Sequence, residues 1–518
     1  MLERLLSLRR IGGTKTDHPL ADSRELRRII GDIPADNTFK AIDEIIGWLE
    51  SLQGTRDFPE DRLYEALSRL DDAAQPHLRR QARDYLHAPR LSRAEEKRLW
   101  TIHHGFWSLL ASGYERCLQA LGQKTRVGEQ IRQVLPALTA RLISALAGVL
   151  KWEQFHYGPA AGGLWQRLGA ALLAAEGAGV AGRSLQLREG VSGVSSPQQE
   201  FVKAVAFQAA SMGSLLPLEI ELAERLIAHF LPGFVFSATA QADSVYWVDL
   251  AQPAPPMRLA RMPSCATPTQ RFFKPGTAHA AIEKLLHDLE LGHDVPGDLA
   301  LGGQYHARAL LPALRHLAAY LAPVPPQRRH DRHNVKQRAL VVHGLNDVRL
   351  ALAGKLAGQP GQAGEPPVES WIVENVSRGG FGALVNNIPG EWLRIGALLA
   401  LQPEGGATWL VGIVRRYQRM GDAGVQVGVE LLALQVTPIE LKTRAASTYA
   451  AAAGMPALLL RDGNAPGEVR IVMPFASFSL RETLEYEQDG RRIPLSPVAI
   501  GEQAADYELA RFRPLAPA

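Results

Sequence analysis

The most distinctive chemistry in this chain lies in a run of small polar residues and glycines, Asn375-Val376-Ser377-Arg378-Gly379-Gly380. Apolar runs at 371–373 and 381–385 flank it, so the pattern predicts a turn within or between β-strands. The short polar side chains offer hydrogen bonds, and the glycines let backbone N–H groups approach a ligand closely. The run is therefore a candidate anion-binding corner.

Two arginines lie four residues apart upstream of this turn, at Arg328 and Arg332. The spacing alone is weak evidence, because it recurs at Arg24/Arg28, Arg79/Arg83 and Arg415/Arg419. The pattern Asp/Asn-x-Ser-x-x-Gly, by contrast, occurs once in the chain, in the turn described above. The segment 328–338 also holds several cations against a single acid, Asp331, which fits an anionic ligand.

In combination, the two patterns resemble a PilZ domain, the bacterial receptor module for cyclic di-GMP, in which Arg-x-x-x-Arg is followed by Asp/Asn-x-Ser-x-x-Gly. The resemblance implies that the arginines contact guanine and phosphate while the turn lies under a guanine edge. A guanidinium suits both targets, because it pairs with phosphate oxygens or with guanine O6 and N7, and it stacks on purines. The implied ligand-binding residues are Arg328, Arg329, Arg332, Asn375, Ser377 and Gly380.

The sequence after the turn supports this resemblance, which covers residues 325–435. Residues 409–416 and 425–431 read as strands, with a glycine-containing turn between them, and they are similar to the later strands of a small antiparallel PilZ barrel. One departure is an extra stretch between Arg332 and Asn375, with a helix-like segment at 345–352 and a Gly/Pro loop at 358–364. A barrel that has lost the nucleotide is therefore an alternative.

Composition bounds the remaining possibilities. With 518 residues, 46% of them hydrophobic, the chain is long enough for two to four domains. A formal net charge of +4 is too small to predict a nucleic-acid partner, and two cysteines indicate a reducing compartment. No catalytic or metal-binding pattern is visible in the sequence, so we expect no enzyme activity, no metal and no cofactor apart from the ligand cyclic di-GMP.

The first ten residues lack the long apolar core of a signal peptide, and the most apolar helical region, 134–152, contains two cations. We expect that region to be a buried helix and not a membrane span, and we expect a cytoplasmic protein.

The expected fold is multidomain α+β, with a mainly α-helical N-terminal region, a PilZ-like antiparallel β-barrel and a small β-rich C-terminal unit. Helical periodicity dominates from Asp36 onwards, and a stiff Pro-Val-Pro-Pro linker at 323–326 precedes the arginines. The expected segments are a polar N-terminal segment at 1–35, a helical domain at 36–230, a mixed α/β segment at 231–322, the barrel at 325–435 and the C-terminal unit at 454–518.

We therefore expect a cyclic di-GMP-binding effector that signals through its helical region to a protein partner, whose identity the sequence does not reveal. The alternative is a nucleotide-independent interaction scaffold with a degenerate PilZ-like barrel. Whether one or two dinucleotides bind stays open at this point, as does the output pathway.

Overall fold

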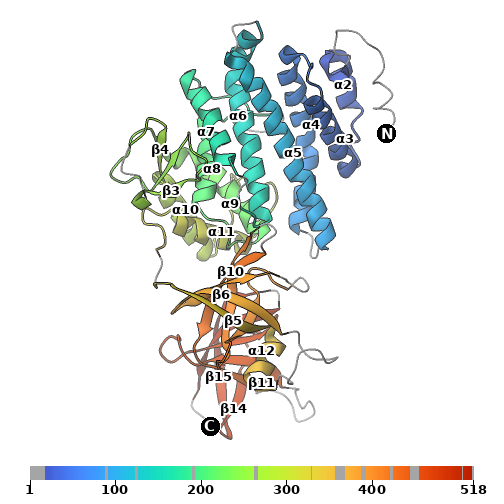
Figure 1. Ribbon diagram of the computed structural model, residues 1–518. Helices are drawn as coiled ribbons and strands as arrows, with labels where there is room; N and C mark the ends of the chain where they lie inside the picture. The colour runs from blue at the N-terminus through green and yellow to red at the C-terminus, as the bar shows by residue number, and fades with distance from the viewer. Residues whose placement is uncertain are drawn as a thin grey trace. The chain divides into compact units, whose positions relative to one another are not determined.

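The computed structural model of the chain divides into two compact units, Met1–Pro326 (unit 1) and Gln327–Ala518 (unit 2) (Figure 1). The structure describes residues 18–515, with gaps at 88–91, 123–125, 160–161, 190–192, 262–265, 328–329, 356–367, 387–391, 421–423, 444–453 and 505. The first unit is mainly helical and the second is built of strands, which confirms the expected α+β class.

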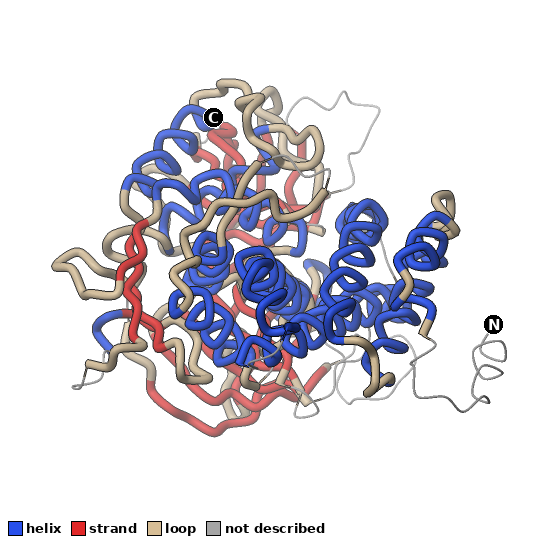
Figure 2. The backbone as a smooth tube through the Cα atoms, turned by 90° about the horizontal axis from the view of Figure 1, so that it is seen from above, coloured by secondary structure: helices blue, strands red, loops and turns tan. Residues whose placement is uncertain are grey.

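Unit 1 is an array of helices whose neighbours lie side by side, as Figure 2 shows from above. Its N-cap chemistry is readable in the sequence: the Asn37 side chain accepts a hydrogen bond from the N–H of Lys40 and so begins α3. Apolar residues at helical spacing along α3, such as Ile42 and Leu49, are buried. The first helices are α2 (Ser23–Gly31), α3 (Thr38–Gly54), α4 (Glu60–His87), α5 (Arg93–Gln119), α6 (Arg126–Phe155), α7 (Leu164–Gly177), α8 (Pro197–Ala209) and α9 (Pro217–Phe230).

Helix α6 contains the most apolar stretch of the sequence. Among the described residues it is the one helix long and apolar enough to cross a membrane, and 72% of that stretch is buried inside the unit. It contacts α5, α7 and α8, so its apolar faces are covered by protein. This is the environment of a core helix.

A small sheet follows these helices, in the strand order β1-β4-β2-β3. Its strands are β1 (Val235–Ser237), β2 (Tyr246–Asp249), β3 (Met257–Arg258) and β4 (Gln270–Lys274), and it is followed by α10 (Thr277–Glu290) and α11 (Ala307–Tyr320). The same apolar core runs from Leu20 to Leu321 through the helices and this sheet. The mixed segment that we expected at 231–322 is therefore part of the same compact unit as the helices before it.

The first barrel of unit 2 is a closed antiparallel barrel with the strand order β10-β7-β6-β5-β8-β9. Alternating apolar residues explain the strands, since in β10 the side chains of Val425, Val427 and Val429 are buried while Glu430 is exposed. The strands are β5 (His333–His343), β6 (Glu369–Ser377), β7 (Gly380–Val385), β8 (Leu398–Pro403), β9 (Leu410–Arg419) and β10 (Val425–Ala433).

The C-terminal β-rich unit is a second closed barrel, with the order β11-β12-β13-β16-β15-β14. Its first strand pairs with β12 and β14 and begins at Val436, upstream of residue 454, where we expected the unit to begin. The strands are β11 (Val436–Thr443), β12 (Met455–Leu460), β13 (Val469–Pro474), β14 (Leu484–Gln488), β15 (Arg491–Gln503) and β16 (Tyr507–Pro514).

Helix α12 (Leu345–Leu352), the extra segment noted in the sequence, lies between the two barrels. Its residues Val348 and Ala351 share one core with Val411 of the first barrel and Leu458 of the second. Polar contacts add to this joint, because the Arg415 guanidinium pairs with Glu430 at 2.7 Å and with Glu502 of the second barrel at 2.6 Å. The burial of Arg415 opposes its charge, but these carboxylates more than offset it and raise its pKa.

Candidate functional site

The predicted turn is the tip of a β-hairpin. Strand β6 ends at Ser377, strand β7 begins at Gly380, and Arg378 and Gly379 form the two-residue connection. Ser377 and Gly380 face each other across the hairpin, and the Ser377 hydroxyl donates a hydrogen bond to the Gly380 carbonyl at 3.1 Å. The serine thus stabilises the shape of the turn from within it.

Gly380 is buried and allows close backbone approach. A methyl group at this position would lie 2.1 Å from the carbonyl oxygen of Val429 on β10. The N–H of Leu431 also donates to the Gly379 carbonyl at 3.0 Å. The glycine is required because the hairpin tip packs directly on β10, so its place in the motif is explained by barrel closure.

One row of residues crosses five strands on the outer face of the first barrel. In register, Asn334 pairs with Asn375, Asn375 with Gly382, Gly382 with Gly428, and Gly428 with Arg416. Directly paired residues point to the same face of a sheet, and the neighbouring residues Phe381, Ala383 and Val427 are buried on the other face. The two glycines therefore form a side-chain-free floor between Asn375 and Arg416.

The Asn375 side chain lies across this floor. A methyl group on Gly382 would be 2.7 Å from the Asn375 Nδ2 and 2.9 Å from its Oδ1. Within the described parts of the chain, the buried Oδ1 has no hydrogen-bond partner. A buried carbonyl oxygen left without a donor costs about 1–3 kcal/mol, so this atom is well suited to accept an N–H from a ligand.

The segment that carries the arginines returns to the same hairpin. Strand β5 pairs with β6 so that His333 faces Val376, and the same register carried one residue back brings Arg332 level with Ser377. The His330 ring lies over the turn, 3.4 Å from where a Gly379 methyl would be. Arg332 is exposed beside the hairpin tip, whereas Arg328 and Arg329 lie outside the described residues.

The extra segment in the sequence does not separate Arg332 from the turn. Helix α12 follows the far end of β5, ten residues from His333, which corresponds to about 33 Å at the usual rise of a strand. The insertion therefore extends the barrel away from the site.

Two exposed cations beside the hairpin were not among the expected site residues. Arg378 lies in the turn itself and Arg416 at the end of the glycine floor, and neither has an ion pair within the described residues. Arg378 could have been found, because it occupies a variable position of the Asn-x-Ser-x-x-Gly pattern. Arg416 could not, since only the pairing of β9 with β10 places it there.

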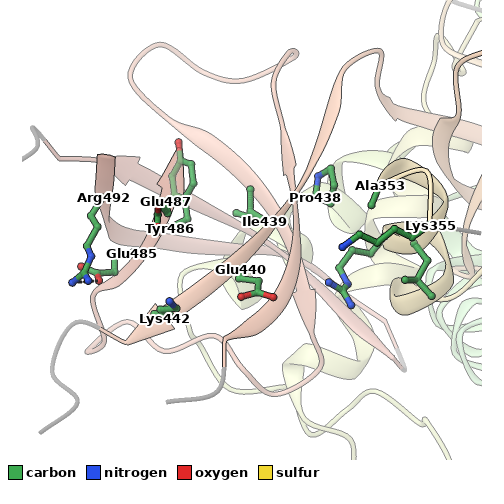
Figure 3. A pocket seen from close by; sticks show the side chains of 12 residues that line it. Ala353, Lys355, Pro438, Ile439, Glu440, Lys442, Glu485, Tyr486, Glu487 and Arg492 are labelled. Carbon is green, nitrogen blue, oxygen red and sulfur yellow. Dashed lines mark ion pairs between the residues drawn. The ribbon is translucent and has the colours of Figure 1, made fainter. Parts of the chain in front are cut away.

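A separate cavity of about 380 Å³ lies in unit 2 between α12 and the second barrel, and Figure 3 shows the side chains around it. Its charges are nearly balanced: the basic residues are Arg349, Lys355, Lys442 and Arg492, and the acidic ones are Glu440, Glu485 and Glu487. Arg492 already pairs with Glu485 at 3.6 Å. None of the predicted site residues that the structure describes lines it, and its mixed charge does not favour an anion.

Comparison with known protein families assigns most of the helical region and the first barrel. The family model of the N-terminal domain of the cyclic-di-GMP receptor FimW matches residues 24–241, and the model of its middle PilZ domain matches residues 328–438. The second match contains all of the predicted site residues and ends inside β11. A search of curated proteins found no match.

The two matches together span more than half of the chain. The match to the N-terminal domain precedes the match to the middle domain, as in the receptor itself. The barrel, the hairpin with its Asn375–Gly380 tip and the helical region before it agree with this assignment. This chain is therefore a PilZ-domain protein with a long helical N-terminal region, and it belongs to the FimW family of cyclic-di-GMP receptors.

Proposed function

We propose that this chain is an effector that binds cyclic di-GMP on the outer face of its first barrel, with Arg332, Asn375 and Ser377 at the centre of the site. Arg328 and Arg329 would add cations from the same segment, and Gly380 would hold the hairpin tip in place. The proposal rests on the cross-strand row in which Gly382 and Gly428 lie between Asn375 and Arg416. Arg332 lies beside this row, next to the hairpin tip.

The chemistry of this surface suits the dinucleotide. A purine can lie flat on Gly428, which has no side chain, beside the Asn375 amide that covers Gly382. Its N–H groups can donate to the Asn375 Oδ1, which has no hydrogen-bond partner within the described residues. Arg332 and Arg416 supply guanidinium groups for phosphate or for stacking on a base. Three strand spacings separate Asn375 from Arg416, about 14 Å, which is wide enough for a ligand that contacts both.

Isothermal titration calorimetry of the full chain with cyclic di-GMP tests this site. Arg332→Ala and Ser377→Ala should each weaken binding, Arg332→Ala by about tenfold or more, because one guanidinium contact to guanine or phosphate is worth about 1–3 kcal/mol. Arg338→Ala is the matched control, since Arg338 is an exposed arginine on β5, six residues or about 20 Å beyond Arg332. Equal affinities in all four proteins would contradict the proposed site.

We also propose that the ligand-bound state reaches a protein partner through unit 1. Support comes from the position of the arginines: the boundary between the units falls after Pro326, so Arg328 is the second residue beyond it. A ligand that contacts this segment acts on the chain that joins the two units. The partner would determine the output of the pathway.

Hydrogen–deuterium exchange tests this second step. Addition of cyclic di-GMP should change amide protection in residues 24–241 of the wild-type chain, and the change should be absent in Ser377→Ala. Protection changes confined to unit 2 would instead favour a receptor that does not signal through its helices. If the wild-type chain binds no dinucleotide at all, the nucleotide-independent scaffold with a degenerate barrel becomes the better description. We also propose that the protein acts in the cytoplasm and as a receptor, without catalysis of its own.

A further inference from the structure

A cavity of about 400 Å³ lies within unit 1, far along the sequence from the PilZ barrel. Helix α4 provides one wall, α9 a second, and the loop at 302–305 a third. Its volume falls in the range of small-molecule sites in proteins, about 300–1,000 Å³. None of these residues belongs to the proposed cyclic di-GMP site.

The α4 wall of the cavity belongs to the exposed side of the helix, and arginines dominate it. Pro76, Arg79, Arg83 and Leu86 lie three or four residues apart and so share one stripe of the helix, and all four line the cavity. Like charges four residues apart are mildly unfavourable on a helix. Within the described residues, Arg79 and Arg83 form no ion pair that would relieve this.

A third arginine faces them from α9. The Arg225 side chain packs against Gly302, whose φ of +72° and lack of a side chain leave room for the guanidinium. Arg225 pairs with Glu221 at 2.7 Å. Among the described residues of the cavity wall Glu221 is the one acid, and its nearly fully buried carboxylate also pairs with Lys151. The single acid is therefore already neutralised, and the cavity keeps a surplus of positive charge.

An aromatic side chain completes the wall. The Tyr305 ring stacks on His87, with ring centroids 5.8 Å apart, and its hydroxyl lies 3.2 Å from the His87 Nε2. This contact holds the ring in place beside the three guanidinium groups. A fixed ring next to a cluster of arginines resembles, in its chemistry, the surfaces that hold both the ring and the phosphates of a nucleotide.

We propose that this cavity is a second ligand site of the protein and that it binds a small phosphate-bearing molecule. Arg79, Arg83 and Arg225 bind the phosphate oxygens, because guanidinium forks match phosphate geometry and no unpaired acid competes for them. The site lies entirely in unit 1 and is independent of the cyclic di-GMP site.

Titration of the full chain with inorganic pyrophosphate and, separately, with ADP tests the proposal. Both should bind the wild-type chain, and Arg79→Gln/Arg83→Gln should weaken both by tenfold or more. The matched control is Arg80→Gln, which removes a neighbouring exposed arginine of α4 that does not line the cavity. Tighter binding of ADP than of pyrophosphate would assign the ring of Tyr305 to the base, and equal binding would assign the site to phosphate alone.

Three outcomes would overturn the proposal. The first is no binding of either probe at millimolar concentration. The second is an affinity in Arg79→Gln/Arg83→Gln equal to that of the wild type. The third is equal weakening by Arg80→Gln, which would mean that general surface charge explains the effect. Ser377→Ala must leave pyrophosphate binding unchanged, because its hydroxyl belongs to the other unit.

Discussion

Replacing Gly382 by alanine is the sharpest test of the glycine floor. The backbone of Gly382 has no positive φ, so an alanine is compatible with its conformation. The new methyl group, however, would lie 2.7 Å from the Asn375 Nδ2 and 2.9 Å from its Oδ1. Ordinary contacts are about 3.5 Å or longer, so the amide must move by somewhat less than 1 Å. The substitution should displace the Asn375 side chain without disturbing the backbone.

The expected size of the effect follows from these contacts. Pushing a side chain away from its rotamer costs about 0.5–1.5 kcal/mol, while replacing glycine by alanine within a strand regains about 0.5–1 kcal/mol. The free energy of unfolding should therefore change by less than about 1 kcal/mol. Loss of the ligand's hydrogen bond to Asn375 should cost about 1–2 kcal/mol of binding free energy, which raises the Kd for cyclic di-GMP about five- to thirtyfold.

A double-mutant cycle measured by calorimetry separates this mechanism from a general disturbance. Gly382→Ala should weaken binding in the wild-type chain but have almost no effect in Asn375→Ala, where the methyl group no longer meets an amide. Thermal unfolding of each variant provides the control for folding. Additive effects of the two substitutions, or an unchanged Kd in Gly382→Ala, would refute the role that we assign to Asn375.

Three further predictions concern stability. Gly380→Ala should destabilise unit 2 by about 1–3 kcal/mol in urea titrations, because the methyl group would meet the rigid Val429 carbonyl. Glu502→Gln should lower its stability by no more than about 1 kcal/mol, since the ion pair with Arg415 is partly solvated, and the loss should shrink in high salt. Burial, with a smaller contribution from a nearby lysine, lowers the pKa of His103 to about 3. As the pH falls below 6.5, His103 therefore stays neutral in the folded state but gains a proton in the unfolded state. The free energy of unfolding of unit 1 should therefore fall by about 2 kcal/mol between pH 7 and pH 5 because of this histidine. Urea titrations at the two pH values should show this fall in the wild type and not in His103→Phe.

Much of the architecture was predictable because its signals are local. The Asn37 cap and the apolar spacing behind it predict α3, and the alternation of residues 425–431 predicts β10. The hairpin tip was equally readable, since Ser377 and Gly380 determine its form through contacts within a few residues. For these elements, short-range chemistry and the observed structure agree.

The remaining features depend on pairing between distant segments. Gly428 and Arg416 belong to the site only through the register of β10 with its two neighbours, and no pattern within one strand reveals that register. Strand β11 lies outside both expected segments, and only two residues separate it from β10. Its place in the second barrel depends on its pairing with β12 and β14. Pro438 is tolerated near the start of that strand.

The position of α12 has a practical consequence for anyone who isolates the receptor module. A fragment that ends at residue 438, where the family match ends, would be cut inside β11 and would lose Leu458, Val472 and Tyr507 from the core that covers Val348. The fragment would expose this apolar surface to water and should aggregate or melt early. The two barrels should instead unfold in a single cooperative transition, so ligand-binding experiments require residues 327–518 as one piece.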